Sequence, residues 1–194
     1  LLPQEQIPTP QWVKEEFKKT FYLEDDLVLD LAIATALSTY APGDAIWPLI
    51  VGPSSGGKSE IINAFNKIDF VHEVSELTEN TLLSGMTRDG QETSLLLRIG
   101  KTGMITMKEY TTLLSMRKER SSMIFAQLRN VYDGYYEKKT GTGKNPVWKG
   151  KITFLGGVTE AIYGADEEAA SMGRRNIHYV LPPQNRFITA KTAR

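Results

Sequence analysis

The sequence contains no cysteine and only two histidines, His72 and His178. Without cysteine the chain can form neither a disulfide nor a cysteine-ligated metal site, which is typical of proteins from reducing compartments. A Ser-His-Asp triad or a histidine metal site needs a constellation of groups that the chain does not show. We therefore expect a cytoplasmic protein whose chemistry depends on neither thiols nor histidines.

Long apolar runs and an excess of either charge are missing as well. No run approaches the roughly 20 apolar residues of a membrane helix, so we expect no membrane partner. Lys plus Arg and Asp plus Glu both total 23, so the net charge indicates neither nucleic acid nor membrane. The 194 residues, 41% of them hydrophobic, suit one domain with at most a small appendage. A start at Leu1 without a signal-peptide pattern indicates a trimmed or partial chain.

The sequence does contain a glycine-rich loop, GPSSGGKS at residues 52–59, which matches G-x-x-x-x-G-K-[ST] at every position. In such a loop the backbone N–H groups surround a nucleotide phosphate, the lysine reaches the β- and γ-phosphates, and the hydroxyl ligates Mg²⁺. An apolar run at 45–51 predicts a strand before the loop, and helical spacing over 61–68 predicts a helix after it. We expect ATP to contact Gly52, Pro53, Ser54, Ser55, Gly56, Gly57, Lys58, Ser59 and Glu60.

The remaining chain alternates helix and strand signals. Two helices, one beginning at Pro10 and one containing Leu27 and Leu37, precede the first strand, in which Pro48 should lie near the start because proline cannot donate to a ladder. Further strands are expected over 69–77, 104–107, 152–155 and 177–181, and helices over 79–86, 112–132 and 165–172. This alternation predicts an α/β sandwich with a mainly parallel sheet. We divide it into an N-terminal helical segment (1–44), a core (45–187) and a tail (188–194).

A phosphate loop also needs an acid that orients water and helps to hold Mg²⁺. Glu109 follows the strand over 104–107 and is the best-placed carboxylate, so we assign it both roles, with Ser59 as the other metal ligand. The residue before it is Lys108, where many ATPases with such a loop have aspartate. A magnesium-side carboxylate must then be dispensable or come from elsewhere, for example Glu76. Alternatively, Glu109 is a solvated carboxylate beside a lysine.

Residues 135–151 predict a basic β-hairpin around a Thr-Gly-Thr-Gly turn. From Glu137 to Lys151 there are five lysines against one glutamate, with Tyr135, Tyr136 and Trp148 interleaved. Lysines can neutralise nucleic-acid phosphates and aromatic rings can stack on bases. The alternative is a solvated hairpin whose aromatics pack on the sheet, and for Trp148 and Tyr135 we expect this packing.

The order of these elements resembles the AAA+ ATPases, most closely the helicase-like ATPases of phages and mobile elements, which are related in layout to viral superfamily 3 helicases. The resemblance covers most of residues 22–187, and its specific part is the phosphate loop. It implies a P-loop NTPase (AAA+-like) three-layer sandwich, with N-terminal helices and the hairpin inserted, that assembles as a homo-oligomeric ring. The helical lid usual in this family is not evident after residue 181.

The resemblance also implies further site residues. Thr159, at the end of the strand over 152–155, would sense the γ-phosphate. Arg175, with Arg174 as competitor, would act as an arginine finger on the neighbouring subunit's nucleotide. The hairpin would grip single-stranded DNA through Lys138, Lys139 and Lys144. The alternatives are that Thr159 only caps a helix, and that the arginines only pair with Asp166, Glu167 and Glu168.

Taken together, the sequence predicts an ATP-hydrolysing, Mg²⁺-dependent motor domain, a DNA helicase or translocase of phage or mobile-element replication. Two other functions use the same loop. A nucleotide-gated interaction protein is credible because Lys108 stands beside Glu109. A small-molecule kinase is less well supported because it would leave the hairpin unexplained.

Overall fold

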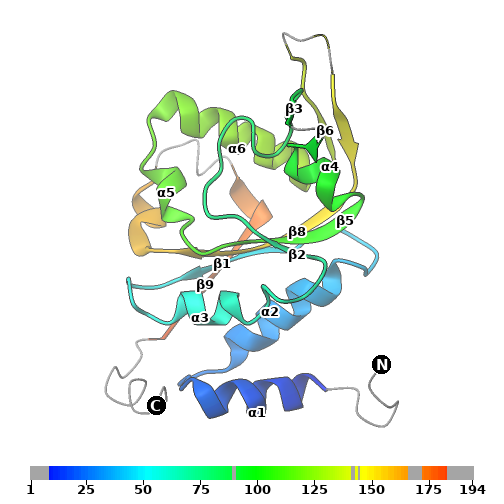
Figure 1. Ribbon diagram of the computed structural model, residues 1–194. Helices are drawn as coiled ribbons and strands as arrows, with labels where there is room; N and C mark the ends of the chain where they lie inside the picture. Colours follow the sequence, from blue (N-terminus) through cyan, green and yellow to red (C-terminus); the bar gives the residue numbers. More distant parts are fainter. Residues whose placement is uncertain (1–8, 89–90, 141–142, 144, 166–171, 183–194) are drawn as a thin grey trace.

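A computed structural model describes residues 9–88, 91–140, 143, 145–165 and 172–182 (Figure 1). The α-helices are α1 (Pro10–Thr20), α2 (Leu27–Ser38), α3 (Lys58–Asn63), α4 (Leu95–Ile99), α5 (Thr111–Leu114) and α6 (Lys118–Tyr132). Two 3-10 helices are η2 (Glu160–Gly164) and η3 (Gly173–Arg175). The strands are β1 (Trp47–Val51), β2 (Val71–Glu73), β3 (Thr87–Arg88), β4 (Gln91–Glu92), β5 (Thr102–Met107), β6 (Tyr135–Glu137), β7 (Val147–Lys149), β8 (Lys151–Val158) and β9 (Asn176–Val180).

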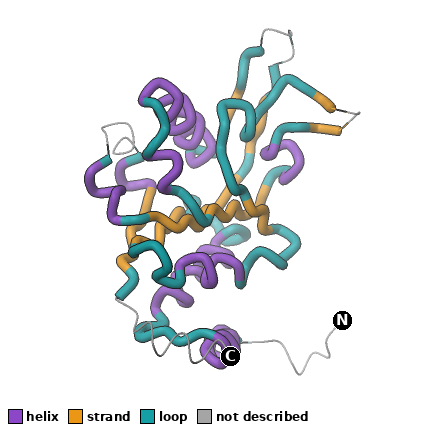
Figure 2. Tube along the Cα trace, turned by 60° about the vertical axis from the view of Figure 1, so that its left-hand side comes forward, coloured by secondary structure: helices purple, strands orange, loops and turns teal. Residues whose placement is uncertain are grey.

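Five strands form one sheet in the order β2-β5-β8-β1-β9, and all of its described ladders are parallel. Helices α1, α2 and α3 lie on one side of this sheet and α4, α5 and α6 on the other (Figure 1), and the turned view of Figure 2 shows the same three layers. The expected α/β class with a mainly parallel sheet is confirmed. Because the strands are parallel, their carboxyl ends all meet at one edge.

Strand β1 is buried along its whole length, which explains its unbroken apolar sequence. It pairs with β9 from Trp47 to Val51, but its ladder with β8 covers only Leu49 to Val51. Pro48, the second residue of β1, has no N–H to donate. The proline therefore lies near the strand's start, as expected, and away from the loop that follows Val51.

Side chains alternate between the two faces of the sheet and divide the core into two clusters. The cluster facing α6 includes Trp47, Leu49, Val51, Ile105, Phe154 and Val158 from the strands and Ile124, Phe125 and Leu128 from the helix. The opposite cluster includes Ile50, Met104 and Leu155 from the strands, Val28, Leu29 and Ala32 from α2, and Ile61 and Ile62 from α3. The sheet is thus covered on both faces, as a parallel sheet requires.

The two helices before β1 lie on the same side of the sheet, with α1 beyond α2 (Figure 1). At the start of α1 the backbone N–H of Trp12 donates to Thr9 Oγ1 at 3.2 Å, so a threonine cap precedes the expected Pro10. Helix α2 packs directly on the sheet. At its end Thr39 Oγ1 and Thr153 Oγ1 lie 2.7 Å apart in the core, which joins the helix to β8.

The helix expected over 79–86 is wrong, since this segment is an irregular loop. Ser94 Oγ accepts a hydrogen bond from the Ser84 N–H at 2.9 Å and donates to the Ser84 carbonyl at 3.0 Å. The Thr78 N–H donates to Thr81 Oγ1 at 2.9 Å. Side-chain hydroxyls that satisfy the backbone in this way compete with helical hydrogen bonds, so the segment does not form the expected helix.

The single helix expected over 112–132 is also wrong, because α5 and α6 are separate helices. At the start of α5, Thr112 Oγ1 donates to the Glu109 carbonyl at 2.8 Å, and at its end Ser115 Oγ donates to the Thr112 carbonyl at 3.0 Å. Arg117 then takes the non-helical angles φ −57° and ψ 140°. Local side-chain bonding therefore closes the first helix before the second begins.

Other boundaries differ in extent. The strand expected over 69–77 is only β2, whereas that expected over 152–155 extends to the whole of β8. The apolar run at 95–99 is helix α4. Most of the acidic helix expected over 165–172, the end of the core after residue 182 and the tail at 188–194 lie outside the described residues.

The Thr39–Thr153 pair gives a test of the core. We expect Thr153→Val to destabilise the protein by about 1–3 kcal/mol, because it leaves the buried Thr39 hydroxyl without a partner. The double variant Thr39→Val/Thr153→Val removes both hydroxyls and should recover most of the loss. Urea unfolding of the three proteins measures this, and equal stability of the single and double variants would contradict it.

Candidate functional site

The glycine-rich loop connects β1 to α3 at the carboxyl-end edge of the sheet. The Gly52 N–H donates to the Val158 carbonyl at 3.1 Å, which joins the loop's first residue to β8. The Gly56 N–H donates to the Pro53 carbonyl at 3.1 Å and closes a tight turn. Ser55 (φ 65°) and Gly57 (φ 86°) both take left-handed backbone angles. The loop therefore makes a tight turn between strand and helix.

Lys58 is the first residue of α3, and its side chain turns back across the loop. Only 8% of the residue is exposed, and Nζ donates to the carbonyls of Gly52 at 2.9 Å and Pro53 at 2.6 Å. Burial lowers the pKa of the Lys58 amine, and the Glu109 carboxylate acts in the opposite direction. The ammonium is thus held at the loop and within the electrostatic reach of Glu109.

The other loop residues differ in exposure. Pro53, Ser54, Ser55 and Glu60 are exposed, and Ser59 is half-buried in the first turn of α3. The tip of the loop is thus accessible from solvent, while Lys58 lies beneath it.

Glu109 reaches the same edge because of a close backbone approach. A β-carbon built on Gly157 would lie 2.7 Å from the Lys108 carbonyl oxygen, so glycine is needed where the chain leaves β5 and passes the end of β8. The Tyr110 N–H then donates to the Gly157 carbonyl at 2.9 Å. These contacts fix the turn that carries Glu109, whose own side chain is exposed.

The lysine before Glu109 has a partner. Lys108 Nζ lies 2.5 Å from Glu73 Oε1 at the end of β2, the neighbouring strand. The other candidate acid, Glu76, is exposed and follows the same strand, from which β1 is separated by both β5 and β8. Of the two acids, Glu109 follows the strand closer to the loop.

Thr159 directly follows β8 and is tied to the chain after Glu109. Its backbone N–H donates to Thr111 Oγ1 at 3.0 Å, and the two hydroxyl oxygens lie 3.3 Å apart. Thr159 stands at the N-cap position of η2 but makes no side-chain capping bond. Thr111, which the sequence did not single out, therefore links the exits of β5 and β8.

Arg175 lies at the opposite edge of the sheet, since it directly precedes β9 and β9 runs parallel to β1. Its Nη2 donates to both carboxylate oxygens of Asp133 at 3.1 Å, and its guanidinium lies 5.6 Å from the centre of the Tyr132 ring. A five-residue strand spans roughly 16 Å, so Arg175 cannot serve the loop of its own chain. The side chain of Arg174 and residues 166–168 lie outside the described part, and no sequence signal pointed to Asp133.

The basic hairpin is present as β6 and β7, with Tyr135 opposite Lys149 and Glu137 opposite Val147. It ends two residues before β8 begins and therefore projects from the edge opposite the glycine-rich loop (Figure 1). Lys138 Nζ donates to the Glu79 carbonyl and, at 2.7 Å, to Asn80 Oδ1, and burial lowers the pKa of Lys138. Lys139 is exposed, and Lys144 lies outside the described residues.

One face of the hairpin packs on the protein and the other faces solvent. Trp148 is buried as expected, and its Nε1 donates to the Gly100 carbonyl at 2.6 Å. The expectation that Tyr135 is packed as well was wrong: Tyr135 is 45% exposed and the neighbouring Tyr136 is buried. Side chains alternate along a strand, so Tyr136, opposite Trp148, takes the inner face. Lys149 Nζ lies 5.4 Å from the centre of the Tyr135 ring on the outer face.

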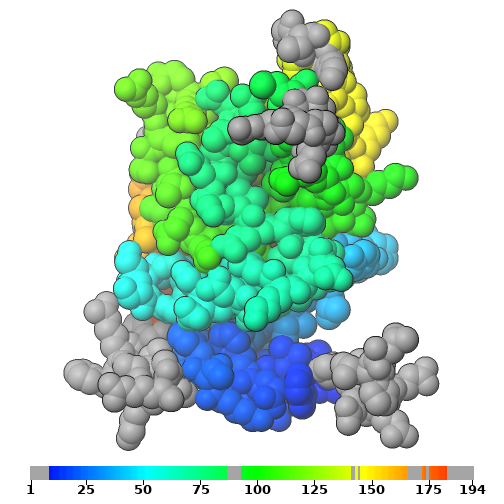
Figure 3. Space-filling model, viewed as in Figure 1, coloured from blue at the N-terminus to red at the C-terminus, as the bar shows by residue number. Residues whose placement is uncertain are grey.

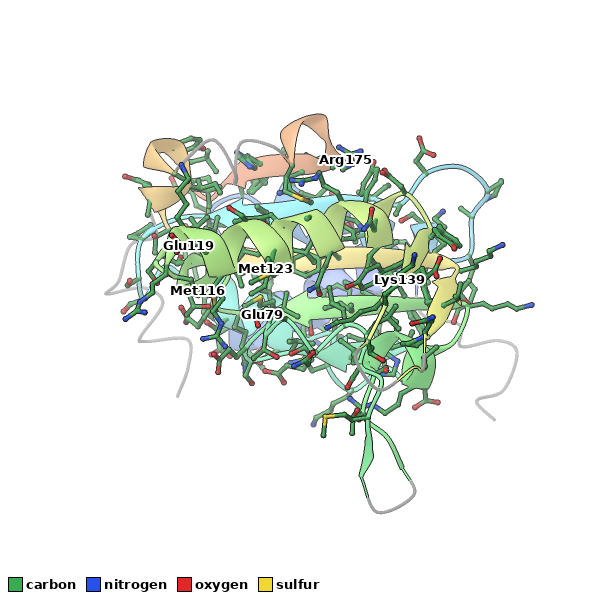
Figure 4. The ribbon with its side chains drawn as sticks, turned by 90° about the horizontal axis from the view of Figure 1, so that it is seen from above. Glu79, Met116, Glu119, Met123, Lys139 and Arg175 are labelled. Atoms are coloured by element: carbon green, nitrogen blue, oxygen red, sulfur yellow. The ribbon has the colours of Figure 1, made fainter. Side chains whose placement is uncertain are left out.

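A depression of about 470 Å³ lies between the loop at Glu79 and the start of α6. Met116, Arg117, Glu119, Arg120 and Met123 line the rest of it. Figure 4 shows Glu79, Met116, Glu119 and Met123 close together, apart from both Lys139 and Arg175. None of the site residues expected from the sequence lines this depression.

No protein-family model and no curated protein matches the sequence. Within the described residues no three His, Cys, Asp or Glu side chains gather around a possible metal position. A magnesium ion held by one hydroxyl, one carboxylate, phosphates and water needs no such group. No described helix combines the length and apolarity needed to cross a bilayer.

Gly57 gives a test of the loop's geometry. We expect Gly57→Ala to destabilise the protein by about 1–3 kcal/mol, because the residue has φ +86° and a β-carbon there would meet a buried phenyl ring at 2.5 Å. Gly164→Ala is the matched control, since a β-carbon added there would have no atom within 4 Å. Urea unfolding compares the two, and similar losses would contradict a special role for Gly57.

Proposed function

We propose that this protein is a P-loop ATPase with an AAA+-like fold that binds ATP with Mg²⁺ at residues 52–59 and hydrolyses it. The main support is the position of Lys58, whose ammonium is hydrogen-bonded beneath the loop. At the same sheet edge, the Glu109 carboxylate interacts electrostatically with this ammonium. The full match to the phosphate-loop pattern at the end of a buried parallel strand supports the same conclusion. The donors suit the ligand: backbone amides and an ammonium for phosphates, and the Ser59 hydroxyl for the metal.

Each residue has a defined task in this proposal. The loop amides other than those of Gly52 and Gly56, which already donate within the chain, bind the phosphates. Lys58 exchanges its bonds to the loop carbonyls for contacts with the β- and γ-phosphates. Ser59 and Glu109 hold the metal, which neutralises phosphate charge when bound. Glu60, at the third position of α3, borders the phosphate site.

Glu109 orients the attacking water and takes up its proton. The oxygen of that water forms a bond to the γ-phosphorus, while the bond from the γ-phosphorus to the bridging oxygen breaks and ADP leaves. Thr159, held by Thr111 at the same edge, senses the γ-phosphate. These groups come from three separate strand ends that lie side by side.

We assign Arg175 to the neighbouring subunit's nucleotide in a homo-oligomeric ring. Its position at the edge away from its own loop supports a role between subunits, and its pairing with Asp133 must be broken for that role. Arg174 stays the competing candidate. A guanidinium that stabilises charge on the γ-phosphate can raise turnover by about 10³–10⁵.

We assign the hairpin to single-stranded DNA, as in a helicase or translocase of phage or mobile-element replication. Lys139 is exposed, and the exposed Tyr135 with Lys149 offers a ring beside a cation. Lys138 is less available because its ammonium is bonded within the chain. Lys144 completes the expected contacts.

One observation favours a second candidate function. Lys108 pairs with Glu73, so the strand end before Glu109 carries a bound cation and not a second carboxylate. Weak metal binding would slow hydrolysis and leave a nucleotide-gated interaction protein, in which binding itself is the signal. The small-molecule kinase has no comparable support.

Two variants test the proposed hydrolysis. We expect Lys58→Ala to abolish ATP binding, because the phosphates lose their main cation. Glu109→Gln should bind ATP as the wild type does but turn it over about a hundredfold more slowly or worse, because the general base is gone. Binding is followed with a fluorescent ATP analogue and turnover by phosphate release.

Glu76→Gln serves as the comparison, since it removes an exposed carboxylate from a more distant strand end of the same edge. Unchanged turnover in this variant leaves Glu109 as the working acid. Undiminished turnover in Glu109→Gln contradicts its role. Tight ATP binding without turnover in the wild type favours the nucleotide-gated function.

The hairpin gives a separate prediction. The double variant Lys139→Ala/Lys144→Ala should flatten the slope of log affinity for single-stranded DNA against log salt by about 1.4, because each lost phosphate contact removes roughly 0.7. Fluorescence anisotropy with a labelled oligonucleotide over a salt series measures the slope. Lys19→Ala on α1, across the sheet from the hairpin, is the control and should leave the slope unchanged. An unaltered slope in the double variant counts against contact at the hairpin.

A further inference from the structure

The connection between α1 and α2, residues 21–26, passes against the glycine-rich loop. Phe21 is only 9% exposed. A β-carbon built on Gly57 would lie 2.5 Å from Cζ and 3.0 Å from Cε1 of the Phe21 ring. The ring thus fills the space that a side chain at position 57 would take in any residue other than glycine.

Several contacts hold Phe21 in this place. Its N–H donates to the Phe17 carbonyl at 3.0 Å, at the end of α1, and the rings of Phe17 and Phe21 meet edge to face with centroids 5.7 Å apart. Two residues later, Leu23 is buried in the same cluster. Asp25 Oδ2 accepts a hydrogen bond from the Tyr179 hydroxyl on β9 at 2.7 Å. The connection is therefore anchored on both sides of Phe21.

Helix α1 is tied to α2 by charge. Lys14 Nζ lies 2.9 Å from Asp30 Oδ1, and Lys18 Nζ lies 2.5 Å from Asp26 Oδ2. In Figure 3, α1 and α2 (blue) form the lower end of the molecule, below the cyan segment that begins with the loop and α3. A shift of α1 would therefore move Phe21, which contacts the loop at Gly57.

Phe21 contacts Gly57, whose backbone conformation decides where the loop N–H groups point. Gly57 has φ +86°, and the N–H groups around it are those that would converge on a phosphate. Glycine has wide backbone freedom, so a loop with adjacent Gly56 and Gly57 needs outside support to stay in one conformation. A phenyl ring offers no hydrogen bond to a phosphate, so any effect of Phe21 on binding must act through the loop.

We propose that Phe21 is a positioning residue for the phosphate loop, and that docking of α1 and nucleotide binding are coupled through it. This inference rests on the proposed ATP binding. Since coupling is reciprocal, a bound nucleotide must also stabilise the docked position of α1. Neither the phosphate-loop pattern nor any spacing in the sequence points to Phe21.

The first experiment measures the dissociation constant of a fluorescent ATP analogue. Phe21→Ala should weaken binding about tenfold, because a less preorganised loop has to be ordered on binding. Phe21→Leu refills much of the space over Gly57 and should restore most of the affinity. Phe70→Ala is the matched control, because Phe70 packs against the same cluster but precedes β2, on the far side of the sheet from the loop. The ATP-analogue affinity of this variant should stay within about twofold of the wild type.

The second experiment uses the wild-type protein. A non-hydrolysable ATP analogue should slow amide hydrogen exchange in residues 10–20, although α1 contributes no residue to the loop. This measurement decides the question if Phe21→Ala does not fold.

The outcomes separate the two proposals. Wild-type affinity in folded Phe21→Ala, or unchanged exchange in α1 on saturation with the analogue, overturns the role of Phe21. Equal weakening by Phe70→Ala would mean a general loss of stability and would overturn it too. Failure of the wild type to bind the analogue overturns the proposed ATP binding itself.

Discussion

The common direction of the five strands is the constraint on which the rest of the molecule depends. Because every described ladder of this sheet is parallel, the loop after β1, Glu109 after β5 and Thr159 after β8 meet at one edge of the sheet. Neighbouring strands are about 4.8 Å apart, so these exits lie roughly 10 Å from one another or closer. The same rule sends the hairpin and Arg175 to the other edge. The separation of the proposed nucleotide site from the surfaces proposed to meet DNA and a neighbouring subunit thus follows from strand direction.

At two places in this arrangement, a glycine allows another part of the chain to approach closely. Gly157 lets the chain leaving β5 pass over the end of β8, and the turn formed there carries Glu109. Gly57 accepts both a left-handed conformation and the ring of Phe21. In each case the missing β-carbon permits a contact between segments far apart in the sequence.

The sequence predicted those parts of the fold that depend on neighbouring residues. The strand before the loop, the helix after it and the hairpin all carry their signals within a few positions, and the α/β class follows from their alternation. It failed where side-chain hydroxyls satisfy the backbone, as Ser94 does in the segment over 79–86, or as Ser115 does at the end of α5. Propensity and periodicity do not record such bonds.

For the candidate site, the sequence pointed to the loop and to Glu109 as candidates but not to what surrounds them. The pairing of Arg175 with Asp133 joins residues 42 positions apart, and the contact of Phe21 with Gly57 depends on where α1 ends. The side of the hairpin on which Tyr135 lies depends on register, which a single-residue shift would reverse. Contacts of this kind depend on tertiary packing, so no local sequence pattern predicts them.

Helix α2 has a consequence for any shortened version of the chain. By its place in the sequence, before the first strand, α2 could be taken for a segment separate from the core. In the structure it covers Ile50, Met104 and Leu155 on one face of the sheet. Truncating the chain just before β1 would uncover that face and expose an apolar surface to water. The smallest piece able to fold unaided therefore has to keep α2, and keeping Phe21 with it requires a start upstream of residue 21.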